Sequence, residues 1–185
     1  MIKLRPYQEE AIESTLKYFQ EEEGNPLIVL PTGTGKSVVI ADFCKRILTQ
    51  WPDTKILVIT HVRELIRQNY EELKGFWPEA PAGINSAGLN KRDYDPSIVF
   101  CGIQSVYGKA SRFTKVDLVL VDEAHLIPRK TNTMYQKFLN NLKRLALGAI
   151  FKSLNCEGGN ENVWQIIGKE TGFRLLRIFP ALNLL

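Results

Sequence analysis

Four short apolar runs divide the first part of the chain, and each is continuous rather than alternating between apolar and polar positions. They cover residues 26–30, 55–60, 97–101 and 117–121. Continuous runs of this length that are rich in Val and Ile are typical of strands covered on both faces, as in parallel sheets. The pattern therefore predicts four buried strands.

Segments with helical periodicity lie before, between and after these runs. Helices are expected over residues 6–22, 38–48, 62–73 and 135–146, the last of them capped by Thr131 or Asn132. Residues 77–96 are rich in Pro, Gly and Asn and predict one long irregular loop. Strands that alternate with helices predict an α/β fold, in which a parallel β-sheet is sandwiched by helices.

Composition narrows the class of protein only slightly. The 185 residues are 44% hydrophobic and 24% charged, as in an ordinary soluble domain. Three dispersed cysteines exclude a disulfide framework, and Cys44 and Cys101 are expected in the core. The net charge of +4 permits a polyanionic partner without requiring one. No apolar run approaches the ~20 residues of a membrane span and no signal peptide is evident, so a cytoplasmic location is expected.

The first apolar run leads directly into a glycine-rich loop and then a helical pattern. The loop consists of Pro31, Thr32, Gly33, Thr34, Gly35, Lys36 and Ser37. This context is that of a phosphate-binding loop, in which backbone N–H groups and a helix N-terminus bind phosphate oxygens. Lys36 is expected to reach the β- and γ-phosphates, and the Ser37 hydroxyl to bind Mg²⁺. The simpler alternative is a tight turn with a solvated lysine, and Leu30 replaces the first glycine of the general pattern.

The fourth apolar run ends in a second candidate group, the tetrapeptide Asp122-Glu123-Ala124-His125. A carboxylate at the tip of a parallel strand lies beside the phosphate-binding loop, so Asp122 is expected to hold Mg²⁺, in part through water. Glu123 is placed to orient and deprotonate an attacking water. His125 is expected to link this site to another surface. The alternative is a pair of exposed acids that cap a strand.

These two motifs, PTGTGKS followed by DEAH, resemble the first RecA-like lobe of superfamily-two DEAD/DEAH-box helicases. The resemblance is to the RadD-like group of bacterial DNA-repair helicases and the helicase subunits of restriction enzymes, and it spans roughly residues 3–145. It implies a single RecA-like P-loop NTPase lobe over residues 1–150 that uses ATP and Mg²⁺. It also implies single-stranded or duplex DNA as a partner, with RNA not excluded.

The segment Leu4-Arg5-Pro6-Tyr7-Gln8 resembles the adenine-recognition motif of the same helicases. The resemblance implies that Gln8 binds the adenine edge and that Arg5 lies close by. A glutamine amide can donate to and accept from adenine at the same time, which gives this role a physical basis.

Two further segments resemble the motifs that touch a nucleic-acid backbone. The segment 61–68, HVRELIRQ, implies contacts by His61, Arg63 and Glu64, and the segment 102–105, GIQS, implies contacts by Gln104 and Ser105. Without the resemblance, the first is an amphipathic helix and the second a helix cap.

Residues 151–185 match no motif of the family. The expected strand, for which 146–151 is a candidate, should precede a Ser/Thr-Ala-Thr coupling motif, but Lys152-Ser-Leu-Asn follows. One hypothesis is a truncated or frame-shifted product, and the other is a divergent tail that completes the sheet. A coupling motif in another reading frame of the downstream nucleotide sequence would favour the first.

The leading functional hypothesis is the ATP-binding and DNA-binding lobe of a helicase or translocase in DNA repair or restriction. A second RecA-like lobe or a partner subunit would be needed for full activity, so weak hydrolysis and no unwinding are expected of this chain. The alternative is a non-catalytic module that binds nucleic acid or a partner enzyme. The DEAH and HVRELIRQ segments argue against a metabolic P-loop kinase.

Overall fold

The computed structural model describes residues 3–21, 25–31, 33–113, 115–127, 132–145 and 172–177. The helices are α1 (Pro6–Glu21), α2 (Lys36–Gln50), α3 (Arg63–Phe76), α4 (Ile103–Val106) and α5 (Met134–Leu145), with the short turns η1 (Ala87–Leu89), η2 (Ala110–Arg112) and η3 (Ala124–Leu126). The strands are β1 (Leu27–Val29), β2 (Ile56–Thr60), β3 (Ala82–Ser86), β4 (Lys91–Arg92), β5 (Ile98–Gly102), β6 (Leu118–Val121) and β7 (Gly172–Arg177). None of the helices in the described ranges has the length and apolar character needed to cross a bilayer.

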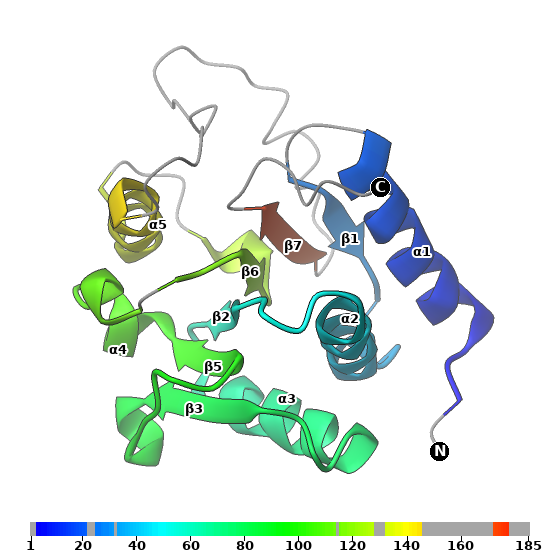
Figure 1. Cartoon of the computed structure of the whole chain (residues 1–185), viewed down its shortest axis with the longest axis horizontal. Helices are drawn as coiled ribbons and strands as arrows, with labels where there is room; N and C mark the ends of the chain where they lie inside the picture. Colours follow the sequence, from blue (N-terminus) through cyan, green and yellow to red (C-terminus); the bar gives the residue numbers. More distant parts are fainter. Residues whose placement is uncertain are drawn as a thin grey trace.

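The strands form one seven-stranded sheet in the order β1-β7-β6-β2-β5-β3-β4 (Figure 1). Strands β6, β2, β5 and β3 are mutually parallel. Strand β7 is antiparallel to both β1 and β6, so those two strands run in the same direction. The parallel strands therefore end at one edge of the sheet, as the α/β fold predicted from the sequence requires.

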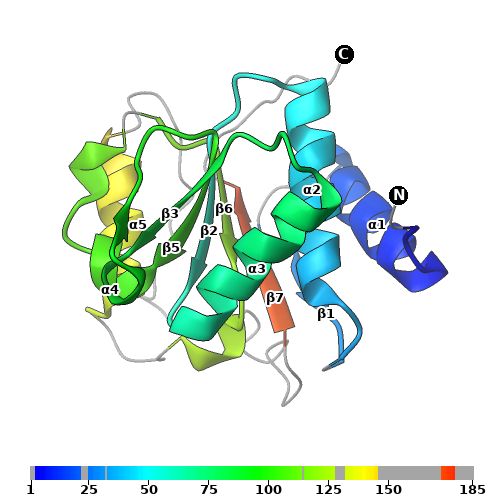
Figure 2. The ribbon, with the colours of Figure 1, turned by 90° about the horizontal axis from the view of Figure 1, so that it is seen from below.

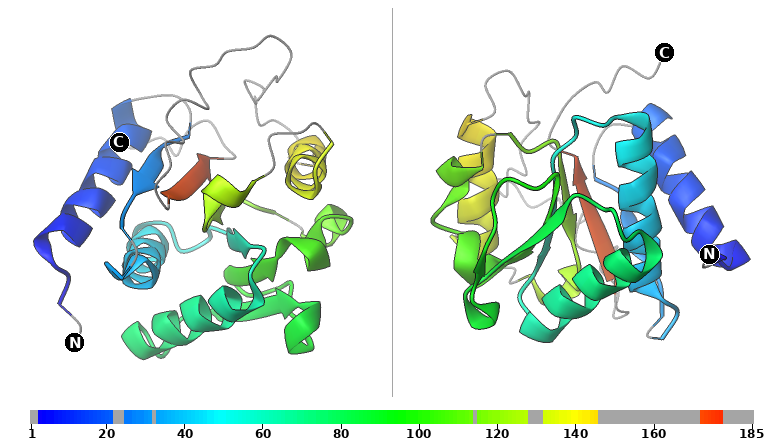
Figure 3. Two further views of the ribbon diagram at one scale, coloured as in Figure 1. Left: turned by 180° about the vertical axis from the view of Figure 1, so that it is seen from behind. Right: turned by 60° about the horizontal axis from the view of Figure 1, so that its bottom comes forward.

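Helices cover both faces of the sheet. Figure 2 shows α2 and α3 on one face and α4 and α5 on the other, and α1 packs outside α2. The two views of Figure 3 show the same layers from behind and from a tilted angle. The predicted opening helix is confirmed at its start, Pro6, and it extends to Glu21.

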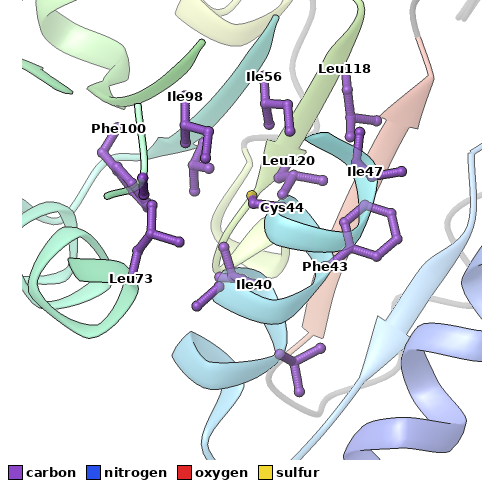
Figure 4. Close-up of a cluster of buried hydrophobic side chains, with 14 of the residues drawn as sticks. Ile40, Phe43, Cys44, Ile47, Ile56, Leu73, Ile98, Phe100, Leu118 and Leu120 are labelled. Carbon is purple, nitrogen blue, oxygen red and sulfur yellow. The ribbon is translucent and has the colours of Figure 1, made fainter. Parts of the chain in front are cut away.

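Two hydrophobic clusters fill the spaces between the sheet and these helices. Successive residues of each central strand point to opposite faces, so Val58 joins one cluster and Ile59 the other. In Figure 4, side chains of α2, among them Phe43 and Cys44, face Leu118 and Leu120 of β6. Cys44 and Cys101 are fully buried, which confirms their predicted place in the core and raises the pKa of both thiols.

The prediction of one irregular loop over residues 77–96 was wrong. The segment contains β3, which pairs in parallel with β5, and β4, which pairs with the end of β3. The sequence of β3, AGINS, contains Ala, Gly and Asn, three residue types that are depleted in strands. Pairing with β5 and burial of Asn85 override that local preference, since the Asn85 amide donates to the carbonyl of Asp93 at 3.0 Å.

The cap of α5 also differs from the prediction. The structure begins α5 at Met134 and uses Thr133, rather than Thr131 or Asn132, as the capping residue. The Gln136 N–H donates to Thr133 Oγ1 at 3.2 Å, and the Thr133 N–H donates to Gln136 Oε1 at 3.1 Å. This is a reciprocal capping box, in which two unpaired N–H groups at a helix start are satisfied together.

Strand β7 comes from the segment for which the sequence offered no family motif. It lies between β1 and β6, with Arg174 opposite Leu27 on one side and opposite Val121 on the other. The candidate strand 146–151 lies outside the described residues. A strand of the tail therefore joins the strand before the glycine-rich loop to the rest of the sheet.

We expect Arg174→Pro to lower the free energy of unfolding by about 1–3 kcal/mol, because proline removes an N–H from a strand that is paired on both sides. Urea denaturation of the full chain measures this loss. Arg174→Thr is the matched control, since it removes the same charge but keeps the N–H and suits a strand. Equal stabilities of the two variants would contradict the placement of β7.

Candidate functional site

The polar candidates follow the strands that end at one edge of the sheet. The glycine-rich loop follows β1, Asp122 and Glu123 follow β6, and His61 follows β2. Ile59 of β2 lies opposite Val121 of β6, so these two strands end almost level. The topology thus brings together side chains that are far apart in the sequence.

The glycine-rich loop has the backbone of an anion-binding turn. Gly33 and Gly35 both adopt left-handed conformations, with φ of 81° and 78°. Gly35 is also the N-cap residue of α2 and accepts hydrogen bonds from the N–H groups of Val38 and Val39. The N–H groups of Lys36 and Ser37 precede these first helical hydrogen bonds, so they can bind phosphate oxygens. Thr32 lies outside the described residues.

Lys36, Glu123 and His125 form a chain of charged and titratable side chains at this edge. The Lys36 amine lies 3.6 Å from Glu123 Oε1 and donates to the Leu30 carbonyl at 3.4 Å. The other carboxylate oxygen of Glu123 lies 3.2 Å from His125 Nδ1. Glu123 has φ of 55°, an uncommon conformation for a residue with a side chain, of the kind that is often found at functional sites.

Asp122 is the most enclosed acidic residue of the site, with 3% of its surface exposed. Its Oδ1 accepts the N–H of Glu123 at 3.0 Å, and its Oδ2 accepts the Asn69 amide at 2.9 Å. Burial raises the pKa of Asp122 above the usual carboxyl value, and the hydrogen bond from Asn69 opposes that rise. Asn69 was not among the residues that the sequence singled out.

The predicted adenine-binding residue, Gln8, lies against the glycine-rich loop. Its Nε2 donates to the Thr34 carbonyl at 2.8 Å, and its Oε1 accepts the N–H of Arg5 at 2.9 Å. The Tyr7 hydroxyl donates to the same Thr34 carbonyl at 2.8 Å. A Cβ on Gly35 would lie only 2.7 Å from Gln8 Nε2. The close contact between the loop and α1 therefore requires glycine at this position.

An ion-pair network holds α1 in this position. Arg46 of α2 is paired with Asp42 of the same helix and with Glu9 of α1, the latter at 2.7 Å. Burial alone would lower the pKa of Arg46, but the hydrogen bonds to Glu9 and Asp42 and the negative charges of these two residues together outweigh it and raise that pKa. Because Glu9 follows Gln8, the network fixes the part of α1 that contacts the loop. No sequence motif marked it, although the i, i+4 spacing of Asp42 and Arg46 is a signal for a helical ion pair.

The predicted nucleic-acid contacts cluster where β2, β5 and β3 end. Arg63 and Glu64 are exposed in the first turn of α3 and form an ion pair at 3.2 Å. The Gln104 amide donates to the carbonyl of His61 at 3.1 Å, which joins the start of α4 to the loop after β2. Ser105 differs from the others because it is buried, and its hydroxyl accepts the N–H of Ala87 at 2.8 Å. Its observed contact is thus with the loop after β3.

The donor set suits a magnesium ion held together with a nucleotide. Mg²⁺ is usually bound by one or two protein oxygens, with waters and phosphate oxygens completing its shell. Ser37 is the second residue of α2, and each oxygen of Asp122 accepts one hydrogen bond and keeps a further lone pair for a water. The described residues contain no group of three His, Cys, Asp or Glu side chains that could hold a metal by themselves. When bound, Mg²⁺ would neutralise phosphate charge.

The fold is that of a single RecA-like lobe, and solved structures share it. The UvsW helicase from bacteriophage T4 matches with a TM-score of 0.62 and 22% sequence identity, over 78% of this chain and 50% of that chain. A Sulfolobus solfataricus SWI2/SNF2 ATPase core, solved in complex with dsDNA, matches with a TM-score of 0.59 and 19% identity, over 78% and 30% of the two chains.

The family model described as "Type III restriction enzyme, res subunit" matches residues 1–153, and the chain belongs to that family. Among curated relatives, the putative ATP-dependent helicase IRC3 of Saccharomyces cerevisiae is 23% identical over 147 residues, which cover 76% of this chain. The match covers 21% of the yeast protein, so the chain spans about a fifth of that relative's length.

The two glycines of the loop provide a matched pair of substitutions. Both Gly33→Ala and Gly35→Ala should lose about 1–2 kcal/mol of stability, because each forces a side chain into the left-handed region. Gly35→Ala should lose about 1 kcal/mol more because its Cβ displaces the buried Gln8 amide, whereas a Cβ on Gly33 meets nothing within 4 Å. Urea denaturation measures both losses, and equal losses would show that the Gln8 contact contributes nothing.

Proposed function

We propose that this chain is the ATP-binding and DNA-binding lobe of a helicase or translocase that hydrolyses ATP to move on nucleic acid. The lobe covers residues 1–150 and acts in the cytoplasm, in DNA repair or restriction. The observation that carries the proposal is the convergence of Lys36 and Glu123, 3.6 Å apart, beside the left-handed turns of Gly33 and Gly35. Membership in the restriction-enzyme res-subunit family and the likeness to helicases support it.

Each residue of the site has a role in this proposal. The backbone from Pro31 to Ser37 holds the phosphates, with Lys36 on the β- and γ-phosphates. Ser37 and Asp122 would hold Mg²⁺, and Glu123 would act as the base that takes a proton from the attacking water. The position of Glu123 suits that role, because its carboxylate lies 3.6 Å from the amine of Lys36, the residue assigned to the phosphates.

Adenine recognition is assigned to Gln8, with Arg5 beside it. Gln8 already contacts the carbonyl of Thr34, so the residue that would bind the base also contacts the loop that would bind the phosphates. His125, 3.2 Å from Glu123, is the proposed link from hydrolysis to another surface.

The nucleic-acid surface is assigned to the loop after β2 and to the first turns of α3 and α4. His61, Arg63, Glu64 and Gln104 are its direct contacts, and Ser105 supports it through Ala87. DNA is proposed as the partner because a solved structure of similar fold is a complex with dsDNA. Arg63 is the cation of this set, and phosphate contacts of this kind position a strand without recognising its sequence.

In related nucleotide hydrolases, an arginine that reaches the transferred phosphate is worth roughly 10³–10⁵ in rate. We propose that a second RecA-like lobe or a partner subunit supplies this arginine. The 185 residues alone would then bind ATP but hydrolyse it very slowly, and they would not unwind DNA.

Lys36→Ala should weaken ATP binding by about tenfold or more, because a charge-assisted contact with the phosphates is lost. Isothermal titration of the full chain with ATP and Mg²⁺ measures the affinity. Lys17→Ala is the control, since Lys17 forms only an exposed pair with Glu21 on α1. Unchanged affinity in Lys36→Ala would overturn the proposed nucleotide site, and robust unwinding by the wild-type chain would overturn the proposed dependence on a second lobe.

Arg63→Ala should weaken binding of a single-stranded DNA oligonucleotide. It should also reduce the slope of the logarithm of affinity against the logarithm of salt concentration by about one. Fluorescence anisotropy across a series of salt concentrations gives both quantities. Arg67→Ala is the matched control, because Arg67 lies one turn further along the same helix and pairs with Glu71. Equal effects of the two variants would show that α3 contributes only general positive charge.

A further inference from the structure

We propose that Asn69 is a positioning residue that holds the Asp122 carboxylate in place for the nucleotide-bound cation and ties it to helix α3. The inference rests on the proposed function, since it concerns the same nucleotide site. Asn69 belongs to neither the glycine-rich loop nor the DEAH segment. It lies in α3, the helix that follows β2.

The contact between the two side chains is short and enclosed. Asn69 Nδ2 donates to Asp122 Oδ2 at 2.9 Å, and the two residues are separated by 53 positions in the sequence. Their exposed fractions are 2% for Asn69 and 3% for Asp122. A charge-assisted hydrogen bond in such surroundings is stronger than the same bond on the surface.

Packing alone does not explain an asparagine at this position. The buried residues of α3 are Ile66, Asn69 and Leu73, so the amide interrupts an otherwise apolar face against the sheet. Asn69 Oδ1 is buried and has no hydrogen-bond partner among the described residues. An unpaired buried carbonyl oxygen destabilises the fold, and a leucine here would avoid that penalty. The hydrogen bond from Asn69 Nδ2 to Asp122 offsets this penalty.

Asn69 fixes the rotation of the carboxylate. One oxygen of Asp122 is held by the N–H of the next residue, Glu123, and the other by Asn69. The terminal torsion of an aspartate is intrinsically broad, so a single local anchor leaves the second oxygen free to swing. With both anchors present, one orientation is selected before a cation arrives, and outer ligands of this type tune metal affinity.

The same helix carries the proposed nucleic-acid contacts at its start. Arg63 precedes Asn69 by six residues, which is about 9 Å along a helix axis. Helix α3 is therefore one rigid element with an exposed charged turn at one end and the anchor of Asp122 near its middle.

The test is the gain in ATP affinity that Mg²⁺ provides, measured as the ratio of the dissociation constant in EDTA to that in excess Mg²⁺. The full wild-type chain is compared with Asn69→Leu, which removes the donor, and with Asn69→Ala, which is smaller and serves if the leucine variant does not fold. Leu73→Val is the control, because it disturbs the same apolar face and leaves the amide intact. Thermal unfolding verifies that each variant is folded.

We expect the magnesium-dependent gain to fall about tenfold in both Asn69 variants while their affinity for ATP in EDTA stays within about twofold of wild type. Leu73→Val should keep the gain. An unchanged gain in a folded Asn69 variant overturns the inference and leaves the nucleotide site standing. An equal loss with and without Mg²⁺ overturns it as well, because it would indicate a purely structural role. A wild-type chain that binds no ATP overturns the proposed function itself, and the inference with it.

Discussion

The candidate chemistry of this protein depends on one constraint: the central strands are covered by helices on both faces. Every residue of β2, β5 and β6 is buried, so these strands have no solvated face on which a charged group could lie. Polar side chains can appear only where the strands end. Because the strands are parallel, those ends share one edge, and the segments that begin at Pro31, His61, Gln104 and Asp122 meet there.

Several of the charged and amide groups at this edge are already paired with one another. Lys36 is shared between Glu123 and a carbonyl, and the amide of Gln8 is shared between Arg5 and Thr34. Nucleotide binding at such a site is an exchange of contacts, so its free energy is the difference between new and old pairings. No charged side chain in the described part of the site is left both buried and unpaired, so a ligand that binds there must replace existing pairings.

The sequence predicted what depends on local pattern. The glycine-rich loop, the DEAH segment and the start of α1 at Pro6 carry strong local signals, and the structure brings the first two together. The sequence pattern could not predict β3, because its residues favour a loop and form a strand only when they pair with β5. It also could not predict the antiparallel direction of β7. Asn69 was missed because no sequence motif marks a single asparagine in an amphipathic helix. Its role becomes visible only when the fold places Asp122, 53 residues away, beside it.

The position of β7 has a consequence for the order in which the protein folds. Strand β1 is made before every other strand of the described sheet, yet the strand that the structure places beside it, β7, is made only after all the candidate site residues. Contacts between segments so distant in sequence form slowly, because a long loop must close first. Until then β1 has open edges that another chain could pair with. Newly made protein should therefore be most prone to aggregation, and most dependent on chaperones, in the interval before residues 172–177 dock.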